Sequence, residues 1–347
     1  MKERHVDGLQ GWIAFSRPRY YCPACDKGYY PRDRELGLEE RSRMSSQKEQ
    51  QLALLSVRLS YEEARRVYRE LTGHGVGKMT AHRTVQRLGK TVREETHESS
   101  PKREKKSQSQ EKGKKHTTAD GAMIHIRDEG WKEAKVGACY EVDRNRRAGN
   151  VKYAATLGER SGLGAMLYDL AGKPELEETQ AMAFVSDAAR WLGEIPEIHF
   201  PLATVIVDFW HAAEYLWKVA SVFYGQGTVK AIQWAQARIR WLRDGDQRSL
   251  RGSLARLRPK TEEQKKNLED ARRYFKNHGH KMDYPKYEAM GFHIGSGIAE
   301  GACKHVIQSR FKQTGMRWSR EGAENLLRLR VCYLNSGHIP VMESCFN

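Results

Sequence analysis

The stretch that decides the fold is residues 183–208, AFVSDAARWLGEIPEIHFPLATVIVD. It contains two short apolar runs, at 183–186 and 205–207, and an aspartate follows each of them. Short apolar runs are typical of buried strands in a sheet covered by helices, with functional groups at their carboxyl ends. The residues between the runs predict a helix over 188–193, packed through Trp191 and Leu192. The stretch therefore predicts two strands that present Asp187 and Asp208.

Upstream of this stretch, the sequence predicts three strands with short connections. They are expected at 117–127, which contains Asp120, and at 134–142 and 151–157, followed by a helix near 163–170. Neighbouring strands joined this closely favour an antiparallel meander. Three such strands, a helix, and two more strands separated by a helix make the element order of an RNase H-like fold. In that fold, carboxylates from the first strand, the fourth strand and a late helix converge on two divalent ions.

A late helix with a carboxylate is predicted by IGSGIAEGACKH, residues 294–305. Glycines and a serine precede the helix, Glu300 lies in its first turn, and Lys304 projects from the same face. Such a carboxylate among cations suits a metal ion and a phosphate chain, although a plain helix also favours glutamate at its N-terminus. With Asp120 and one of the two later aspartates, Glu300 completes a set of three. Oxygen ligands suit two Mg²⁺ (or Mn²⁺) ions, which promote phosphoryl displacement.

Composition points to a polyanionic partner. The chain has 347 residues, with 60 lysines and arginines against 44 acids and a formal net charge of +16. Such an excess of positive charge favours nucleic acid as the partner. No stretch approaches the roughly 20 apolar residues of a membrane span, and the N-terminus lacks the apolar core of a signal peptide. Only one close pair occurs among six cysteines, so we expect a cytoplasmic, nucleoid-associated protein with reduced thiols and no membrane partner.

The N-terminal segment, residues 1–40, contains half of a zinc-ribbon motif. Cys22 and Cys25 form a Cys-x-x-Cys knuckle, and zinc needs four ligands, usually from two such knuckles. The chain has no second knuckle, so His5 or another chain would have to supply ligands. The alternative is a relict turn that binds no Zn²⁺.

Residues 45–92 predict a helix-turn-helix. Ser60 and Glu63 form a capping box, glycines at 73–77 break the first helix, and a second helix is expected over 78–91. The sides expected to face inward carry Leu71 in the first helix and Met79, Val85 and Leu88 in the second. The outward side of the second helix is polar and basic, as in a helix that reads the major groove. Its expected DNA-contacting residues are His82, Arg83, Gln86 and Arg87. The alternative is a helical hairpin packed on the rest of the protein.

Two further segments surround the predicted catalytic core. Residues 93–116 contain no aromatic or branched aliphatic side chain, which predicts a disordered basic linker. Residues 213–290 predict a helical insertion between the core parts at 117–212 and 291–335. Its tryptophans are expected to pack in a core, whereas its arginines form a cationic face suited to phosphates. The tryptophans are Trp217, Trp234 and Trp241. The arginines are Arg238, Arg243, Arg248, Arg251 and Arg256.

Six motifs in fixed order make nearly the whole chain resemble the ISKra-type (ISKra-four family) insertion-sequence transposases of the DDE superfamily. They are YCPAC (21–25) with YP (30–31) and LGL (36–38), ADG (119–121) with WKEAKVG (131–137), SDAARW (186–191), VDFWHA (207–212), IGSGIAE (294–300) and GMRWS (315–319). The sequence departs from the family at Ala188, where relatives usually carry glycine. It also begins just before one knuckle, where relatives carry more sequence.

The resemblance implies a Mg²⁺-dependent enzyme that cleaves and transfers DNA strands. Its triad would be Asp120, Asp187 and Glu300, with Asp208 as the alternative second member. Asp208 and His211 match the family's Asp-x-x-His element, and His211 would act as an acid or as a structural residue. We assign auxiliary roles to Asp208, His211 and Lys304, and DNA contacts to Arg310, Lys312 and Arg317.

The implied partners are double-stranded DNA, as terminal inverted repeats and target, and a second copy of the chain in a homodimer or larger complex. Two other functions remain open at this point. One is a non-catalytic DNA-binding regulator derived from a transposase. The other is an RNase H-like nuclease for branched DNA or RNA hybrids, which would have no need of the helical insertion.

Overall fold

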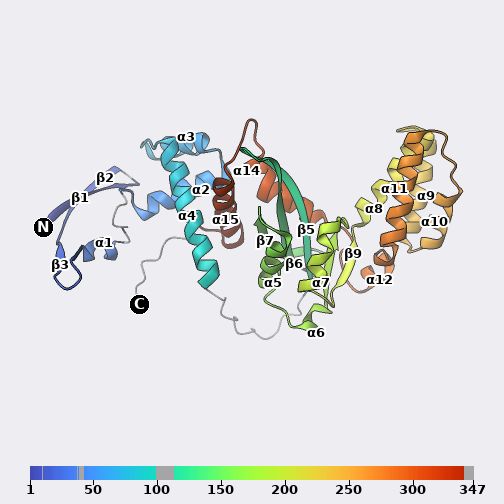
Figure 1. The fold of residues 1–347 in the computed structure, drawn as a ribbon, viewed down its shortest axis with the longest axis horizontal. Helices are drawn as coiled ribbons and strands as arrows, with labels where there is room; N and C mark the ends of the chain where they lie inside the picture. Colours follow the sequence, from blue (N-terminus) through green and yellow to red (C-terminus); the bar gives the residue numbers. More distant parts are fainter. Residues whose placement is uncertain (10, 37, 39–42, 99–112, 340–347) are drawn as a thin grey trace. The chain divides into compact units, whose positions relative to one another are not determined.

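The computed structural model describes residues 1–9, 11–36, 38, 43–98 and 113–339 (Figure 1). It divides into two compact units. Unit 1 comprises residues 1–102, 123–132 and 305–347, and unit 2 comprises residues 103–122 and 133–304. No helix of the described residues is long and apolar enough to span a membrane.

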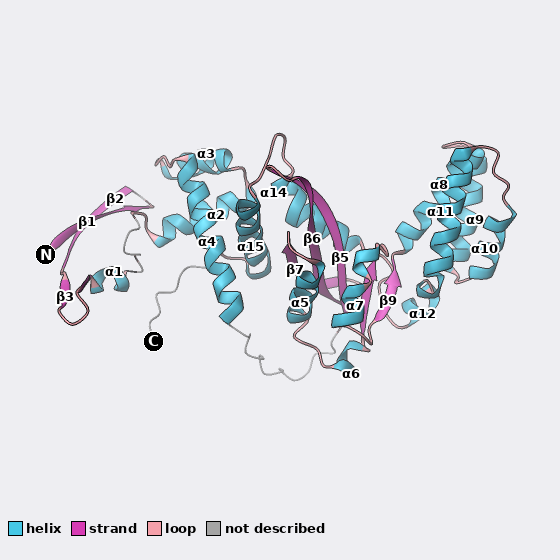
Figure 2. Ribbon diagram, viewed as in Figure 1, coloured by secondary structure: helices cyan, strands magenta, loops and turns pink. Residues whose placement is uncertain are grey.

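Unit 2 is built on a five-stranded mixed sheet, as predicted (Figure 2). The strands are β5 (Lys114–Ile126), β6 (Gly130–Val142), β7 (Ala148–Thr156), β8 (Met182–Ser186) and β9 (Thr204–Val207). Their order across the sheet is β7-β6-β5-β8-β9, so the first strand lies at the centre. β6 and β7 pair antiparallel, whereas β8 pairs parallel with both β5 and β9. The tip formed by the end of β5 and the start of β6 belongs to unit 1.

Short helices accompany the sheet: α5 (Arg160–Leu170), α6 (Leu176–Thr179), the 3-10 turn η1 (Arg190–Leu192) and α7 (Glu194–His199). The expected helix over 188–193 is wrong. Ala188 adopts φ +67°, a left-handed conformation that cannot continue a right-handed helix, and only the short turn η1 follows before α7. Leu192 is nevertheless buried in the core, as predicted, together with Leu163 and Phe184.

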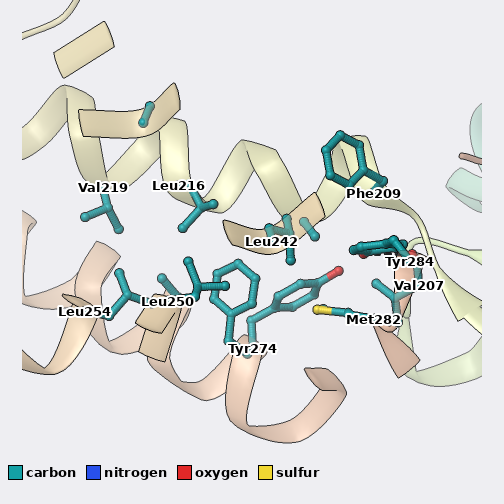
Figure 3. Packing of buried hydrophobic residues seen from close by; sticks show 14 of the residues in the cluster. Val207, Phe209, Leu216, Val219, Leu242, Leu250, Leu254, Tyr274, Met282 and Tyr284 are labelled. Carbon is teal, nitrogen blue, oxygen red and sulfur yellow. Dashed lines mark hydrogen bonds between the residues drawn. The ribbon is translucent and has the colours of Figure 1, made fainter. Parts of the chain in front are cut away.

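The stretch predicted as a helical insertion is helical. It contains α8 (Phe209–Tyr224), α9 (Val229–Arg243), α10 (Gln247–Arg256), α11 (Glu262–His278), the 3-10 turn η2 (Gly279–Lys281) and α12 (Tyr284–Ala289). Leucines and aromatic residues from these helices form one core, which Figure 3 shows around Leu216, Leu242 and Tyr274. Trp234 packs in this core as expected, whereas Trp217 is exposed. After the insertion follow α13 (Gly297–Ala302) and a π-helix, η3 (Cys303–Gln308).

Unit 1 contains two hairpins and a group of helices. Its elements are β1 (Lys2–Gly8), β2 (Gly11–Arg17), β3 (Tyr20–Cys22), β4 (Lys27–Tyr29), α1 (Pro31–Glu35), α2 (Ser46–Arg58), α3 (Tyr61–Thr72), α4 (Lys78–Glu98), α14 (Ser309–Phe311) and α15 (Arg320–Ser336). The predicted capping box of Ser60 and Glu63 is present at the start of α3, which ends at Gly73 with φ +72°. The predicted linker is shorter than expected, because α4 extends to Glu98 and β5 begins at Lys114. Residues 99–112 of the linker lie outside the described residues.

Two inward assignments in these helices are wrong. Leu71 is 75% exposed and Met79 is 56% exposed, whereas Val85 and Leu88 are buried as predicted. α4 packs against α15 as well as against α2 and α3, and these contacts bury Ala81, Val85 and Leu88. Met79, in the first turn of α4, lies outside this buried face.

Candidate functional site

Three aspartates lie next to one another across the sheet: Asp120 is within β5, and Asp187 and Asp208 directly follow β8 and β9. Thr118 of β5 pairs with Val185 of β8, and continuing this register by two residues places Asp120 opposite Asp187. Ser186 pairs with Val207 of β9, so Asp187 in turn lies opposite Asp208. Neighbouring strands are about 4.8 Å apart. The register therefore places Asp120 of β5 next to Asp187, which directly follows β8.

Asp120 is half-buried, and its carboxylate accepts hydrogen bonds from two donors. Its Oδ1 accepts a hydrogen bond from the Gly121 amide at 2.6 Å, and its Oδ2 accepts one from the Cys303 thiol at 3.3 Å. A Cβ atom at position 121 would collide with the carboxylate of Glu133 on β6. The Glu133 carboxylate therefore lies close to Gly121, beside Asp120, and a larger residue at position 121 would require the Glu133 side chain to move.

Cys303 lies among carboxylates and was not predicted as a site residue. It is buried, which raises the pKa of its thiol, and the nearby carboxylates of Asp120, Glu133 and Asp187 raise that pKa further. The thiol therefore keeps its proton and donates to Asp120. Glu133 was missed as well, although it stands within the quoted motif WKEAKVG. The sequence held one signal for each residue. Glu133 lies on β6, the strand next to β5, and Cys303 follows Glu300 by three residues.

Asp187 is half-buried and closes a tight turn. Its Oδ1 accepts a hydrogen bond from the Ala189 amide at 2.8 Å, across the left-handed residue Ala188. The hydroxyl of Tyr274 donates to the backbone oxygen of Asp187 at 3.4 Å. The backbone around this aspartate is thus held from two sides.

Asp208, by contrast, is buried and acts as a clamp between two elements. It caps the N-terminus of α8, where its Oδ1 accepts from the His211 amide at 2.7 Å. Its Oδ2 accepts from the Ser296 hydroxyl at 2.5 Å and from the Ser296 amide. One carboxylate oxygen therefore caps α8, and the other fixes the glycine-rich entry of α13. This geometry gives Asp208 a positioning role.

Glu300 and Lys304 form the pair that their helical spacing predicted. Their charged atoms are 2.5 Å apart, and both side chains are about two-thirds exposed. In the described part of the chain, no three His, Cys, Asp or Glu side chains lie close enough together to hold a metal ion. The structure therefore brings Asp120 and Asp187 together, but it leaves Glu300 paired with Lys304.

His211 begins an aromatic row on the helical insertion. Its ring contacts the rings of Tyr215 and Tyr274, at centroid distances of 5.7 and 6.0 Å. Its Nδ1 lies 3.9 Å from a carboxylate oxygen of Glu214. Asp208 contacts the backbone of His211 and orients the start of its helix.

Several residues predicted to face DNA contact other parts of unit 1. Gln86 donates to the Gly322 carbonyl at 3.2 Å and accepts from Asn325 at 2.9 Å. Arg87 forms an ion pair with Glu49 of α2. His82 is half-buried, with its ring edge-on to that of Tyr61, and burial lowers its pKa. Of the four residues expected to read DNA, Arg83 is the one that is exposed.

The prediction that Arg310 contacts DNA is wrong. Its side chain is fully buried, because its guanidinium donates to the Ser56 carbonyl at 2.8 Å and lies over the rings of Tyr61 and Trp318. Burial lowers its pKa to about 10, so the group stays charged at neutral pH. Arg310 therefore binds within unit 1 and has no surface for DNA. Lys312 and Arg317, also predicted to contact DNA, are exposed.

The cysteine knuckle forms the turn between β3 and β4. The pKa of the Cys22 thiol is lowered, chiefly by a hydrogen bond from the Cys25 backbone, and Cys25 is exposed. Two thiols on a tight turn fit half of a zinc site. His5 lies beside Glu3, at 3.6 Å. No third zinc ligand joins the thiols among the residues that the structure describes.

The cationic face of the insertion is only partly as expected. Arg238 lies over the rings of Trp234 and Trp241, and Arg243 pairs with Glu288 at 2.9 Å. The other arginines named for this face are exposed; they are Arg248, Arg251 and Arg256.

Comparison with known proteins places the chain in a family. Residues 1–343 match UPF0236, described as an uncharacterised protein family. A UPF0236 protein of Caldanaerobacter subterraneus subsp. tengcongensis is 26% identical over 203 residues, which cover 56% of this chain and 40% of that relative. A UPF0236 protein from the vanSb 3′ region of Streptococcus gallolyticus is 24% identical and covers 96% of this chain. The chain spans about 40% of the length of the first relative and 73% of the second. The protein therefore belongs to the UPF0236 family.

Proposed function

We propose that this UPF0236 protein is a DDE transposase of a bacterial insertion sequence, which cuts and joins DNA at the ends of its element. The observation that carries the proposal is the register of the sheet, which places Asp120 beside Asp187. In addition, Cys303 follows Glu300 by three residues, and its thiol donates a hydrogen bond to Asp120.

The strand order supports this proposal. The order across the sheet matches that of an RNase H-like sheet: the first strand is central, the antiparallel pair β6 and β7 lies on one side, and the parallel strands β8 and β9 lie on the other. Carboxylates on the first and fourth strands, and on a helix after a helical insertion, match the arrangement that the motif resemblance implies.

The names of the relatives give independent support. One Caldanaerobacter relative has a name that joins eleven designations within a single strain, and another has a name that joins four. Multiple copies in one genome are expected of an element that moves or copies itself. A housekeeping nuclease has no reason to be repeated in this way.

The side chains fit a divalent metal ion, provided that Glu300 changes rotamer. Asp120 and Asp187 offer the carboxylate oxygens that Mg²⁺ or Mn²⁺ prefers. Glu300 lies three residues before Cys303, so their Cβ atoms are about 5–6 Å apart on one side of the helix. Breaking the exposed Glu300–Lys304 pair costs only about 0.5 kcal/mol. When bound, two such ions would activate the attacking oxygen and stabilise the leaving oxygen.

The remaining residues would orient the site and hold DNA. Asp208 fixes the approach to α13, and with it the direction of Glu300. Lys304, released from Glu300, would neutralise a phosphate. The exposed Arg83, Lys312 and Arg317 would contact the DNA backbone, with α3 and α4 as the helix-turn-helix.

The test uses purified protein and a labelled duplex that carries the DNA flanking its own gene, with Mg²⁺. We expect cleavage at the element boundary by the wild type and by Glu269→Gln, a matched exposed helical glutamate. Glu300→Gln should bind the duplex without cleaving it. Strand transfer by Glu300→Gln at the wild-type rate would refute the proposal, and binding without cleavage by all three proteins would favour a non-catalytic regulator.

A further inference from the structure

A short bridge joins the tip of the β5–β6 hairpin to the segment that precedes α15, and both belong to unit 1. Ile126 pairs with Trp318 in parallel. The Arg127 amide donates to the Trp318 carbonyl at 2.7 Å, and the Trp318 amide donates to the His125 carbonyl at 3.0 Å. The bridge therefore fixes the hairpin tip against the motif GMRWS (315–319).

One side of this bridge is buried and the other is exposed. The side chains of Ile126 and Trp318 are 0% and 8% exposed. Side chains alternate between the two faces of an extended chain. The neighbouring Arg127 and Arg317 therefore point to the opposite face, and both are exposed. The bridge thus brings two guanidinium groups that are far apart in the sequence to one exposed face.

An aromatic side chain extends this face. Trp131, near the start of β6 and within the motif WKEAKVG, is 60% exposed, and its ring lies edge-on to that of His125 at a centroid distance of 5.5 Å. His125 precedes Arg127 by two residues and therefore lies on the same face of β5. Trp131 thus joins Arg127 and Arg317, and we call the surface formed by these three residues the hairpin face.

The hairpin face has an excess of positive charge. Within the part of the chain that the structure describes, the guanidinium groups of Arg127 and Arg317 have no ion-pair or hydrogen-bond partner. Glu129, in the turn of the hairpin, is already paired with Arg320, whose Nε donates to its carboxylate at 2.9 Å. Asp128 is the other acid of this turn. The acids of the turn therefore do not neutralise the two arginines of the hairpin face.

Helix α4 places a further cation near this face. Burial lowers the pKa of His82, and the charges of Arg127 and Arg83 lower it further. Arg127 is thus close enough to α4 for its charge to act on the His82 ring. Arg83 follows His82 in the same helix and is exposed. The hairpin face and the exposed part of α4 therefore form one cationic region of unit 1.

We infer that the hairpin face binds the sugar–phosphate backbone of duplex DNA, with Arg127 and Arg317 on phosphates and Trp131 packed against a deoxyribose. Guanidinium groups match phosphate geometry and bind it bidentately. An indole ring offers apolar surface to the sugar and an N–H donor to an adjacent oxygen. The net charge of +16 favours a polyanion as the partner. This contact rests on the proposed function, because it takes DNA as the ligand, and it adds the hairpin of the central sheet to the DNA-binding surface.

The experiment measures the fluorescence anisotropy of a labelled duplex of arbitrary sequence in EDTA, over a series of salt concentrations. Arg127→Ala and Arg317→Ala should each weaken binding roughly threefold to tenfold and reduce the slope of log affinity against log salt by about 0.9, because each loses one phosphate contact. Arg127→Lys should keep the slope of the wild type. A contact with the backbone carries no sequence information, so a duplex that carries the DNA flanking the gene should lose the same factor.

Two further variants separate the apolar contact from the ionic one. Trp131→Ala should weaken binding several-fold without changing the salt slope, because it removes no charge, whereas Trp131→Phe should keep most of the affinity. Lys266→Ala is the control for the loss of one positive charge, since Lys266 is exposed on α11 in unit 2. It should bind with the affinity and the salt slope of the wild type. A thermal melt of each variant separates a loss of folding from a loss of binding.

Wild-type affinity and salt slope in both Arg127→Ala and Arg317→Ala would overturn the inference, as would an absence of duplex binding by a folded wild-type protein. The outcome is distinguishable from a failure of the proposed function. If the wild type cleaves the element boundary in Mg²⁺ while both arginine variants bind like it, the hairpin face alone is refuted. If both variants lose affinity and slope as expected but the wild type never cleaves, the hairpin face is supported and the transposase is refuted.

Discussion

Asp187 and Asp208 follow the same kind of apolar strand, yet the protein uses them differently. Asp187 is half-buried, and one of its carboxylate oxygens accepts a hydrogen bond within its own turn. Asp208 is buried, and both of its oxygens accept hydrogen bonds from His211 and Ser296. The hydrogen bonds of Asp208 join the start of α8 to the segment before α13, whereas the hydrogen bond of Asp187 stays within its own turn. Under the proposed function, this contrast favours Asp187 as a metal ligand and Asp208 as a positioning residue.

The largest effect should come from removing the charge of Asp187. In Asp187→Asn, we expect Mg²⁺-dependent cleavage of the flanking duplex to fall by roughly 10²–10³-fold, because one charged oxygen ligand is lost at the reacting centre. The melting temperature should change little, since the amide oxygen can still accept from Ala189. Single-turnover cleavage and a thermal melt of the same preparation measure both quantities. Cleavage within threefold of wild type would remove Asp187 from the site.

Substitution of Asp208 should affect stability more than cleavage. Asp208→Ala removes a helix cap and a buried acceptor of charge-assisted hydrogen bonds, which should lower the free energy of unfolding by about 3 kcal/mol. Asp187→Ala should lower it by about 1 kcal/mol or less. Urea titration followed by circular dichroism compares the two variants. Equal losses would contradict the clamp.

The surroundings of Asp120 give a smaller effect, visible in thiol chemistry. The raised pKa and burial of Cys303 should keep it unmodified by iodoacetamide at pH 8 in the native protein. Cys22, with its lowered pKa, and the exposed Cys25 should react first. Peptide mass spectrometry after timed quenching measures the extent of alkylation at each cysteine. Early alkylation of Cys303 would mean that the thiol is not held against Asp120, and the denatured protein serves as the control in which all the thiols react.

The smallest effect concerns the turn that orients Asp187. Ala188 has φ +67°, a conformation that is costly for alanine and easy for glycine. Ala188→Gly should therefore raise the free energy of unfolding by about 0.5–1 kcal/mol without loss of cleavage. Ala189→Gly, where φ is negative, is the control and should not stabilise. A stability loss in Ala188→Gly would show that the turn does not have this conformation in solution.

β8 and β9 were predictable because each is a short apolar run followed by an aspartate, and β5, β6 and β7 were predictable because short turns separate them. The same local signals place Glu300 and Lys304 on one helix face. The roles of the aspartates were not predictable in this way. Asp208 accepts from Ser296, which is 88 residues away, so no local pattern distinguishes Asp208 from Asp187.

Long-range packing also explains the errors in unit 1. Arg310 follows Glu300 in a basic stretch, but the Ser56 carbonyl and the rings of Tyr61 and Trp318 surround its buried guanidinium. The pattern of α4 alone predicts that Gln86 faces solvent, but Asn325 of α15 donates a hydrogen bond to it. A hydrophobic pattern reports which side of a helix is apolar, but it cannot report a polar side that a distant helix covers.

Mn²⁺ binding measured by calorimetry, in the wild type, Asp187→Asn and Asp208→Asn, tests the central assignment most directly. We predict that Asp187→Asn loses Mn²⁺ binding while it melts like the wild type. Asp208→Asn should melt at a lower temperature and, below that temperature, still bind Mn²⁺. The reverse pattern, with binding lost in Asp208→Asn and kept in Asp187→Asn, would contradict the account.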